Sequence, residues 1–154
     1  FGGNIHYYSR SPKETDGWKH HDDIVAMARE VDILIVTLSG GPDTLGMVGA
    51  DALEALGPDG LLVNASRGTT IDESALLDAL ESRSIRAAGL DVFENEPNIN
   101  PRFLELDNVL LQPHQSSGTI ETRKVMGQLQ RDNLAAHFAG QPLLTPVNQC
   151  ALLV

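Results

Sequence analysis

The segment from Val31 to Leu38 constrains the fold of this chain most strongly. It reads Val31-Asp32-Ile33-Leu34-Ile35-Val36-Thr37-Leu38, which is almost continuously apolar and rich in β-branched residues. A strand of this composition is typical of a parallel sheet that is covered on both faces. We therefore expect a central strand here.

Further strands and helices alternate on both sides of this segment. The other predicted strands span residues 4–9, 61–65, 87–92 and 108–112. The predicted helices span residues 22–30, 50–56, 72–80 and 119–139, and Asp22 or Asp23 is expected to cap the first and Asp72 the third. This alternation predicts an α/β fold, a doubly wound parallel sheet in three layers.

Composition and charge exclude several classes of function. The chain has 21 Asp and Glu against 11 Lys and Arg, which argues against nonspecific binding to nucleic acid or to an anionic membrane. No apolar run approaches the roughly 20 residues of a membrane span, and the first residues lack the features of a signal peptide. We expect a cytoplasmic protein in which Cys150, the single cysteine, has no chemical role.

Three polar segments follow predicted strands, at residues 64–68, 91–97 and 113–119. The carboxyl ends of parallel strands meet at one edge of a sheet, so one cleft can gather these segments. They supply a guanidinium, a carboxylate and an imidazole. Such a set can hold a 2-oxo acid and move a proton on or off its oxygen, which points to hydride-transfer chemistry.

The same segments resemble the D-isomer-specific 2-hydroxyacid dehydrogenases, most closely the glyoxylate, hydroxypyruvate and hydroxyphenylpyruvate reductase branch. The motifs that carry the resemblance are Asn64-Ala65-Ser66-Arg67-Gly68, Asp91-Val92-Phe93-Glu94-Asn95-Glu96-Pro97, Pro113-His114-Gln115-Ser116-Ser117-Gly118-Thr119 and Leu143-Leu144-Thr145-Pro146-Val147. The resemblance implies that residues 1–147 form part of a Rossmann-like NAD(P)-binding domain, followed by a tail at 148–154. It also implies that the helix over 119–140 leads back toward a substrate domain outside this chain.

The family's first strand and its Gly-x-Gly-x-x-Gly turn, which meets the pyrophosphate at a helix N-terminus, have no counterpart in this chain. Without that strand we expect an exposed apolar groove, and we expect the isolated chain to be inactive.

The resemblance implies a role for each of three residues. Arg67 would bind the carboxylate and carbonyl oxygen of the substrate, as the planar fork of an arginine suits a carboxylate. His114 would act as the general acid of reduction and the base of oxidation. Glu96 would hydrogen-bond His114, favour the imidazolium and fix the ring, and Glu94 is the rival for this role.

The expected cofactor site draws on residues from several strand ends. By resemblance, Asp91 would contact the nicotinamide end of the cofactor, although a strand-end acid can also simply cap a turn. The remaining positions expected to line the cofactor are Thr37, Leu38, Asn64, Ala65, Ser66, Ser116 and Gly118.

The end of the first strand bears on the choice between NADP and NAD. Ser9-Arg10-Ser11 with Lys13 nearby offers hydroxyl and basic groups but no carboxylate, which favours the 2′-phosphate of NADP. Arg10 could instead be a solvated turn residue, and Asp16 could reach the ribose of NAD if the loop folds back.

Other expectations concern metals, partners and a second class of function. His20-His21-Asp22-Asp23 is a tempting metal cluster, but adjacent residues rarely converge on one ion, so no metal site is expected. The family implies a homodimer that acts on a small 2-oxo or 2-hydroxy acid. The alternative is a non-catalytic interaction domain on the same scaffold.

Overall fold

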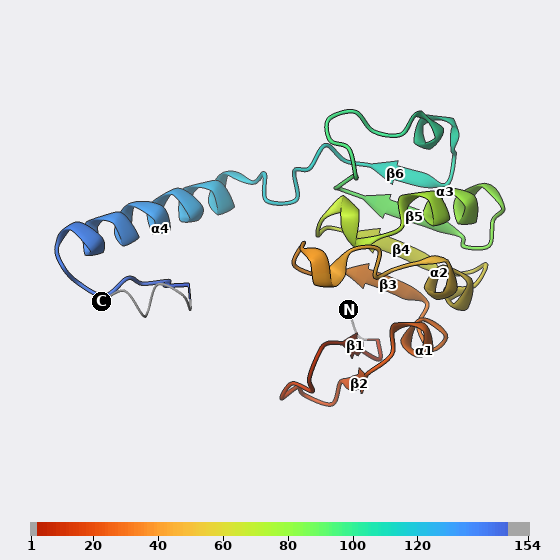
Figure 1. Ribbon diagram of the computed structural model, residues 1–154, viewed down its shortest axis with the longest axis horizontal. Helices are drawn as coiled ribbons and strands as arrows, with labels where there is room; N and C mark the ends of the chain where they lie inside the picture. Colours follow the sequence, from red (N-terminus) through yellow and green to blue (C-terminus); the bar gives the residue numbers. More distant parts are fainter. Residues whose placement is uncertain (1–2, 148–154) are drawn as a thin grey trace. The chain divides into compact units, whose positions relative to one another are not determined.

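The computed structural model describes residues 3–147, and the chain divides into two compact units. The first unit ends at His114 and holds every strand, whereas the second begins at Gln115 and holds the last helix. Figure 1 shows the elements of both units. The predicted tail at 148–154, including Cys150, lies outside the described residues.

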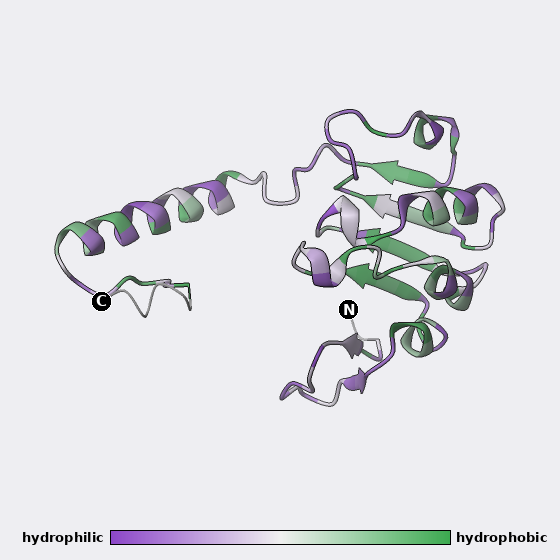
Figure 2. Ribbon diagram, viewed as in Figure 1, coloured by the Kyte–Doolittle hydropathy of each residue, from purple (hydrophilic) through white to green (hydrophobic). Residues whose placement is uncertain are grey.

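A parallel sheet of four strands forms the centre of the first unit. Its strands follow one another in the order of the sequence: β3 (Ile33–Val36), β4 (Leu61–Asn64), β5 (Ala87–Leu90) and β6 (Val109–Leu111). Ile33 lies opposite Leu61, and Leu61 lies opposite Ala87, so three of the strands begin level with one another. The predicted strands are confirmed here, each shorter than the sequence suggested. The hydropathy colouring shows β3, β4 and β6 as strongly hydrophobic and β5 as paler (Figure 2).

A second, two-stranded parallel sheet comprises β1 (His6–Tyr8) and β2 (Lys19–His21). The sequence did not predict β2, because Lys19-His20-His21 carries none of the apolar residues that mark a strand. Among the described residues, β1 pairs only with β2 and β3 pairs only with β4. One edge of β1 and one edge of β3 are therefore free, as expected of a doubly wound sheet without its first strand.

Three helices of the first unit follow the sequence prediction closely. Helix α1 (Ile24–Ala28) is capped by Asp23, whose Oδ1 accepts from the Ala26 amide at 2.6 Å. Helix α2 (Ala50–Leu56) ends at Gly57, where a φ of 79° favours glycine. Helix α3 (Glu73–Glu81) is capped by Asp72, which accepts from the Ala75 amide at 3.0 Å. These caps satisfy amides that the helix itself cannot.

The central sheet has one covered face among the residues described in the first unit. In β3, Leu34 and Val36 are 4% exposed, whereas Ile33 and Ile35 are 52% and 61% exposed. Because alternate residues of a strand face opposite sides, one side of β3 packs against the helices and the other is open. Helices α1 and α2 contact each other, as do α2 and α3, so they form one continuous layer.

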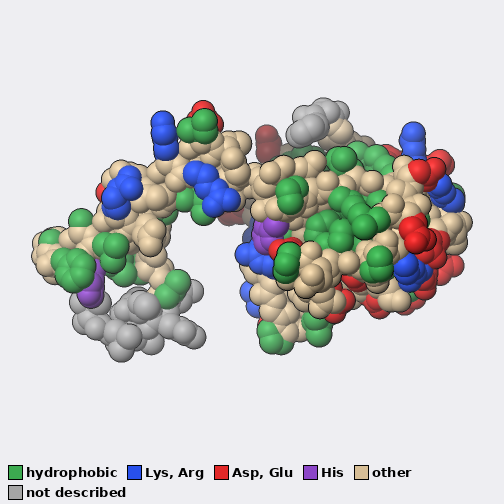
Figure 3. Space-filling view, turned by 90° about the horizontal axis from the view of Figure 1, so that it is seen from above, with side chains coloured by type: hydrophobic (Ala, Val, Ile, Leu, Met, Phe, Trp, Pro, Cys, Tyr) green, Lys and Arg blue, Asp and Glu red, His purple; other side chains and the backbone are tan. Residues whose placement is uncertain are grey.

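The parallel sheet with its flanking helices confirms the predicted α/β, Rossmann-like fold, and the described helices of this unit cover one face of the sheet. An unbroken apolar strand predicts that both faces of the strand are buried, but it does not identify the segment that buries each face. The expected exposed apolar surface is present, and its members on the described strands or beside them include Ile5, Ile33, Ile35 and Leu110. The view in Figure 3 also shows hydrophobic side chains gathered on the side of the unit that carries β6.

The second unit consists of helix α4 (Ile120–Phe138) and the segment after it. Thr119 caps the helix by accepting from the Thr122 amide at 3.2 Å, and Gly140 follows with a φ of 64°. The predicted helix is confirmed. Asn133 Nδ2 donates to Thr145 Oγ1 at 3.0 Å, which ties the returning segment to the helix. No helix in the described part of the chain is long and apolar enough to cross a membrane.

Candidate active site

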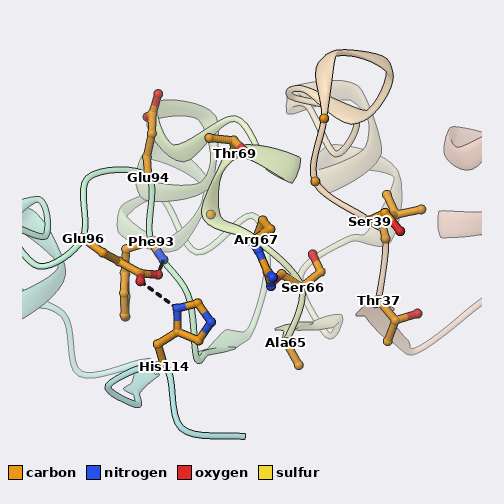
Figure 4. A pocket seen from close by; sticks show the side chains of 14 residues that line it. Thr37, Ser39, Ala65, Ser66, Arg67, Thr69, Phe93, Glu94, Glu96 and His114 are labelled. Atoms are coloured by element: carbon orange, nitrogen blue, oxygen red, sulfur yellow. Dashed lines mark hydrogen bonds and ion pairs between the residues drawn. The ribbon is translucent and has the colours of Figure 1, made fainter. Parts of the chain in front are cut away.

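An open pocket of about 830 Å³ lies where the central strands end. It is lined by the loops that follow β3, β4, β5 and β6, as expected for a parallel α/β sheet. Figure 4 shows Arg67, Glu96 and His114 around this pocket. The full lining comprises Thr37, Leu38, Ser39, Gly40, Gly41, Ala65, Ser66, Arg67, Gly68, Thr69, Phe93, Glu94, Glu96 and His114.

His114 and Glu96 form a hydrogen-bonded pair at one side of the pocket. His114 Nδ1 lies 2.7 Å from Glu96 Oε2, and the other carboxylate oxygen accepts from the Phe93 amide at 2.9 Å. An ionised carboxylate can only accept, so Nδ1 carries a proton and donates it to Glu96. This leaves Nε2 of His114 for a ligand in the pocket. Figure 4 shows His114 lying between Glu96 on one side and Arg67 on the other.

The electrostatics of Glu96 favour its charged form. Partial burial works to raise the pKa of Glu96, but the hydrogen bonds from His114 and from the Phe93 amide outweigh it, and the pKa lies below its ordinary 4.5. Glu96 therefore remains an anion beside His114 across the neutral range. A fixed anion at this position holds the His114 ring through its Nδ1 atom.

His114 has a backbone conformation that few non-glycine residues adopt. Its φ of 53° lies in the left-handed region, where histidine is tolerated better than bulky or β-branched residues. Residues other than glycine that are held in this region are often found at functional sites. The sequence alone gave no sign of this conformation.

Arg67 lies in the loop after β4, and its aliphatic stem packs on the loop after β3. A Cβ atom at Gly40 would lie 2.8 Å from Arg67 Cγ, so only a glycine leaves room for the arginine stem. Arg67 Nη1 donates to the carbonyl of Ser66 at 2.6 Å. That bond uses one of the five N–H groups of the guanidinium, so donors remain for a carboxylate.

The backbone around Arg67 is held by a buried polar network beneath it. Asn64 Nδ2 and Thr70 Oγ1 both donate to the Arg67 carbonyl, at 3.1 and 2.6 Å. Asn64 Oδ1 accepts from the Ser66 amide at 3.0 Å, and Ser66 Oγ lies 3.0 Å from Thr70 Oγ1. All three of these polar residues are at most 5% exposed. The arginine itself is exposed, but the residues that shape its loop are part of the core.

Gly68 brings the loop of Arg67 against the loop of Glu96. A Cβ atom at Gly68 would lie 2.0 Å from the carbonyl carbon of Phe93 and 2.4 Å from the amide nitrogen of Glu94. No side chain fits between these two backbones. The glycine therefore sets the spacing between the guanidinium side and the carboxylate side of the pocket.

Glu94, the rival of Glu96, occupies a different position. It lines the pocket, and its backbone amide donates to Glu73 Oε2 at 3.1 Å. The carboxylate that contacts His114 is that of Glu96.

The expected cofactor residues fall into three groups. Thr37, Leu38, Ala65 and Ser66 line the pocket. Asn64 and Asp91 are buried, at 1% and 8% exposure, and they do not line it. The Asn64 side chain is turned into the network under Arg67, so a cofactor could meet this position only through its backbone.

The remaining cofactor candidates are not among the residues that line the pocket. Ser9, Arg10 and Ser11 follow β1 in the two-stranded sheet, where Ser9 Oγ donates to the Ser11 carbonyl at 2.6 Å. Arg10 and Ser11 are exposed. Ser116 and Gly118 belong to the second unit. Gly68 belongs to a motif that was singled out in the sequence. The positioning roles of Gly40 and Thr70 were not predicted, because close backbone approach and buried hydroxyl contacts leave no local pattern.

Comparison with known proteins agrees with this architecture. Residues 1–116 match the model of the D-isomer specific 2-hydroxyacid dehydrogenase, NAD binding domain. A 2-ketogluconate reductase from Gluconobacter oxydans is 50% identical over 147 residues, which cover 96% of this chain and 47% of the relative. A hydroxyphenylpyruvate reductase from Plectranthus scutellarioides is 46% identical, with 93% of this chain and 46% of the relative covered.

A solved structure supports the same relationship. An NADPH-dependent glyoxylate/hydroxypyruvate reductase from Sinorhizobium meliloti, in complex with NADP and malonate, superposes with a TM-score of 0.91 at 48% identity, covering 96% of this chain and 46% of that one. The chain thus spans about half the length of the relatives it matches. From the family model and these relatives, the chain belongs to the D-isomer-specific 2-hydroxyacid dehydrogenases and carries their NAD-binding domain.

Proposed function

We propose that the complete protein containing this chain is an oxidoreductase that transfers a hydride between NAD(P)H and a small 2-oxo acid, giving a D-2-hydroxy acid. The observation that carries this proposal is the His114–Glu96 pair, which shares one pocket with Arg67. A proton donor and a carboxylate anchor in one pocket are what the reduction of a 2-oxo acid requires.

Each of the three residues has a distinct task in this reaction. Arg67 binds the substrate carboxylate through its free N–H groups and orients the neighbouring carbonyl. His114 donates the proton on Nε2 to the carbonyl oxygen as the carbonyl carbon is reduced. Glu96 holds the ring through Nδ1 and balances the charge of the imidazolium. The nicotinamide, when bound, supplies the hydride.

We assign NADP as the preferred cofactor and NAD as the alternative. Arg10, with Ser9 and Ser11, provides a guanidinium and two hydroxyls after β1, and no carboxylate stands in Ser9-Arg10-Ser11 to accept from a ribose 2′-hydroxyl. The related S. meliloti reductase, which is NADPH-dependent and bound to NADP, supports this assignment. Thr37, Leu38, Ala65 and Ser66 would lie near the nicotinamide end, and Asp91, Asn64, Ser116 and Gly118 remain predicted cofactor positions.

The relatives support a 2-oxo acid as the substrate class. Their names include reductases of 2-ketogluconate, hydroxyphenylpyruvate, glyoxylate and hydroxypyruvate. A homodimer and a cytoplasmic location stay predictions from the family resemblance. Light scattering of the purified complete protein tests the first, and cell fractionation tests the second.

The test of this function is NADPH and NADH oxidation by the complete protein with glyoxylate, hydroxypyruvate, 2-ketogluconate and hydroxyphenylpyruvate. We expect turnover with at least one of the four and a higher kcat/KM with NADPH than with NADH. Arg10→Ala should remove that preference because it removes the guanidinium. If no oxo acid is reduced, the non-catalytic interaction domain becomes the better assignment, and equal efficiency with both cofactors would contradict the role of Arg10.

A further inference from the structure

Three side chains with metal-binding atoms meet outside the pocket, at the two-stranded sheet. His6 comes from β1, His21 from β2, and Glu30 follows α1. His21 lies opposite Tyr8 in the strand register, and residues two apart share a face, so His6 and His21 lie on the same face of this sheet. Helix α1 contacts both strands, which brings Glu30 to the two imidazoles.

The ligating atoms lie close enough together to share one ion. His6 Nδ1 is 3.1 Å from His21 Nε2 and 3.9 Å from a carboxylate oxygen of Glu30, and all three atoms lie within 4.8 Å of one another. In a tetrahedral zinc site with bonds of about 2.0–2.1 Å, neighbouring ligand atoms are about 3.3 Å apart. Small side-chain rotations bring the three atoms to that spacing.

The chemistry of the ligands selects the class of ion. Two neutral imidazoles and one carboxylate suit Zn²⁺ and its transition-metal neighbours, whereas Mg²⁺ and Ca²⁺ prefer oxygen ligands alone. We propose that His6, His21 and Glu30 form a binding site for a divalent transition-metal ion of the Zn²⁺ class. From the sequence, only the adjacent residues His20-His21-Asp22-Asp23 stood out as metal-binding groups, and no metal site was expected there. His20 turns to the Ser9 carbonyl, 3.0 Å away, so the partners of His21 come from other elements.

The contacts that the ion must replace are weak ones. His6 and His21 share one proton between two imidazole nitrogens, and Lys19 forms an ion pair with Glu30. The side chains of Lys19 and Glu30 are 54% and 45% exposed, and exposed ion pairs of this kind add little stability. Lys19 can move into solvent when an ion takes its place.

The proposed ion would act as a clamp on the segment before Ser9. It would join β1, β2 and the segment after α1, which carry His6, His21 and Glu30. The clamp is separate from the proposed hydride-transfer site, whose His114 and Glu96 line the pocket. It therefore does not depend on the proposed function.

The experiment is a titration of the metal-free complete protein with Co²⁺ and with Zn²⁺ at neutral pH, followed by visible absorption and by calorimetry. We expect each chain to bind one Co²⁺ ion with the visible spectrum of four-coordinate cobalt, and we expect Zn²⁺ to displace this ion. His21→Gln should weaken binding by more than the roughly 10- to 100-fold that loss of an outer-shell partner costs. His6→Gln should do the same.

Two variants serve as matched controls. His20→Gln removes the imidazole next to His21 in the sequence, and His114→Asn removes the imidazole of the pocket. Both variants should bind Co²⁺ with unchanged spectrum and affinity. Glu30→Gln alters an exposed residue outside the helix, so it should fold and bind Zn²⁺ at least about 10-fold more weakly even if a histidine variant fails to fold. Binding that survives in Glu30→Gln and both histidine variants, or that is lost only in His114→Asn, would overturn the proposal.

Discussion

Glu96 and His114 illustrate how a pair of side chains divides one task at the scale of single residues. Glu96 is held at both oxygens, by the Phe93 amide and by His114, so its position does not depend on the substrate. Its lowered pKa keeps it charged. The anion in turn orients the imidazole through Nδ1, which leaves Nε2 for the substrate.

Replacing Glu96 by Gln should separate charge from geometry. The amide oxygen of Gln can still accept from His114 Nδ1, but the charge that favours the imidazolium is lost. We expect the alkaline limb of the pH profile for 2-oxo acid reduction to move to lower pH, while the KM for NADPH stays unchanged. The measurement is kcat/KM against pH in the complete protein. An unchanged alkaline limb would remove Glu96 from this role, and Glu94→Gln is the matched control.

The lowered pKa of Glu96 also determines how this carboxylate affects the stability of the fold at acid pH. A carboxyl with a depressed folded-state pKa stabilises the fold above its unfolded pKa, and this contribution is lost as pH falls through the folded value. The Glu96–His114 pair should therefore persist below pH 4.5, the ordinary pKa of the group. NMR titration of the Glu96 carboxyl in the complete protein measures this directly. A midpoint above 4.5 would contradict it.

Arg67 should show its role in substrate binding more than in proton transfer. Lys at this position keeps the charge but loses the planar fork that matches a carboxylate with two hydrogen bonds. We expect Arg67→Lys to raise the KM for the 2-oxo acid by about 10-fold or more, since charge-assisted bonds are worth about 1.5–3 kcal/mol. Steady-state kinetics with hydroxypyruvate tests this. An unchanged KM would show that the carboxylate is bound elsewhere.

At the scale of elements, the pocket depends on how the loop after β4 is supported from below. The hydroxyls of Ser66 and Thr70 have two protons for three contacts. Ser66 Oγ contacts Asn64 Oδ1, Thr70 Oγ1 contacts the Arg67 carbonyl, and the two hydroxyls contact each other. If one of the two end acceptors receives no hydroxyl proton, it still has a partner. The Ser66 amide donates to Asn64 Oδ1, and Asn64 Nδ2 donates to the Arg67 carbonyl. The network is therefore complete without water.

Removing one hydroxyl from this network should loosen the loop that carries Arg67. Thr70→Val keeps the shape but leaves the Arg67 carbonyl and Ser66 Oγ each with one partner fewer, at a cost of about 1–3 kcal/mol in the free energy of unfolding. We expect a raised KM for the oxo acid, with the pH profile of His114 unchanged. Thr70→Ser, which restores the hydroxyl, should recover most of both. A Thr70→Val variant with wild-type KM would separate the network from substrate binding.

The elements themselves were largely predictable from the sequence, and the exceptions have physical reasons. Apolar periodicity and capping residues such as Asp72 are local signals, and the predicted helices and central strands follow them. β2 escaped because Lys19-His20-His21 owes its extended form to pairing with β1, which is a tertiary contact. The identity of Arg67, Glu96 and His114 came from motifs at strand ends. The positioning roles of Gly40 and Thr70 could not be predicted from such motifs, because they depend on contacts that form only when the loops are folded.

At the scale of the whole molecule, the open face and the free strand edges are the main departure from a closed α/β domain. Ile33 and Ile35 are more than half exposed, and one edge of β3 is unpaired among the described residues. Contiguous exposed apolar surface of this kind usually marks a contact with another segment or chain. The chain spans about half of its relatives, whose remaining half could supply such a segment.

The isolated chain should therefore behave differently from the complete protein. We expect residues 1–154 on their own to bind an apolar fluorescent dye strongly, and Ile35→Thr to reduce this signal by removing apolar surface from the open face. Dye fluorescence of the isolated chain, its Ile35→Thr variant and the complete protein, measured at equal protein concentration, checks this. Equal and low dye binding by the isolated chain and the complete protein would show that the face is covered in both.

The central claim is that His114 delivers the proton in a reduction whose substrate Arg67 anchors. The most direct measurement is kcat for 2-oxo acid reduction by the complete protein carrying His114→Asn, because Asn tolerates the left-handed backbone of this position. We predict that kcat falls by about 10²–10⁴-fold, the usual contribution of general acid catalysis, while NADPH binding measured by fluorescence stays within about twofold of wild type. A variant that binds NADPH normally and keeps its kcat would contradict the account.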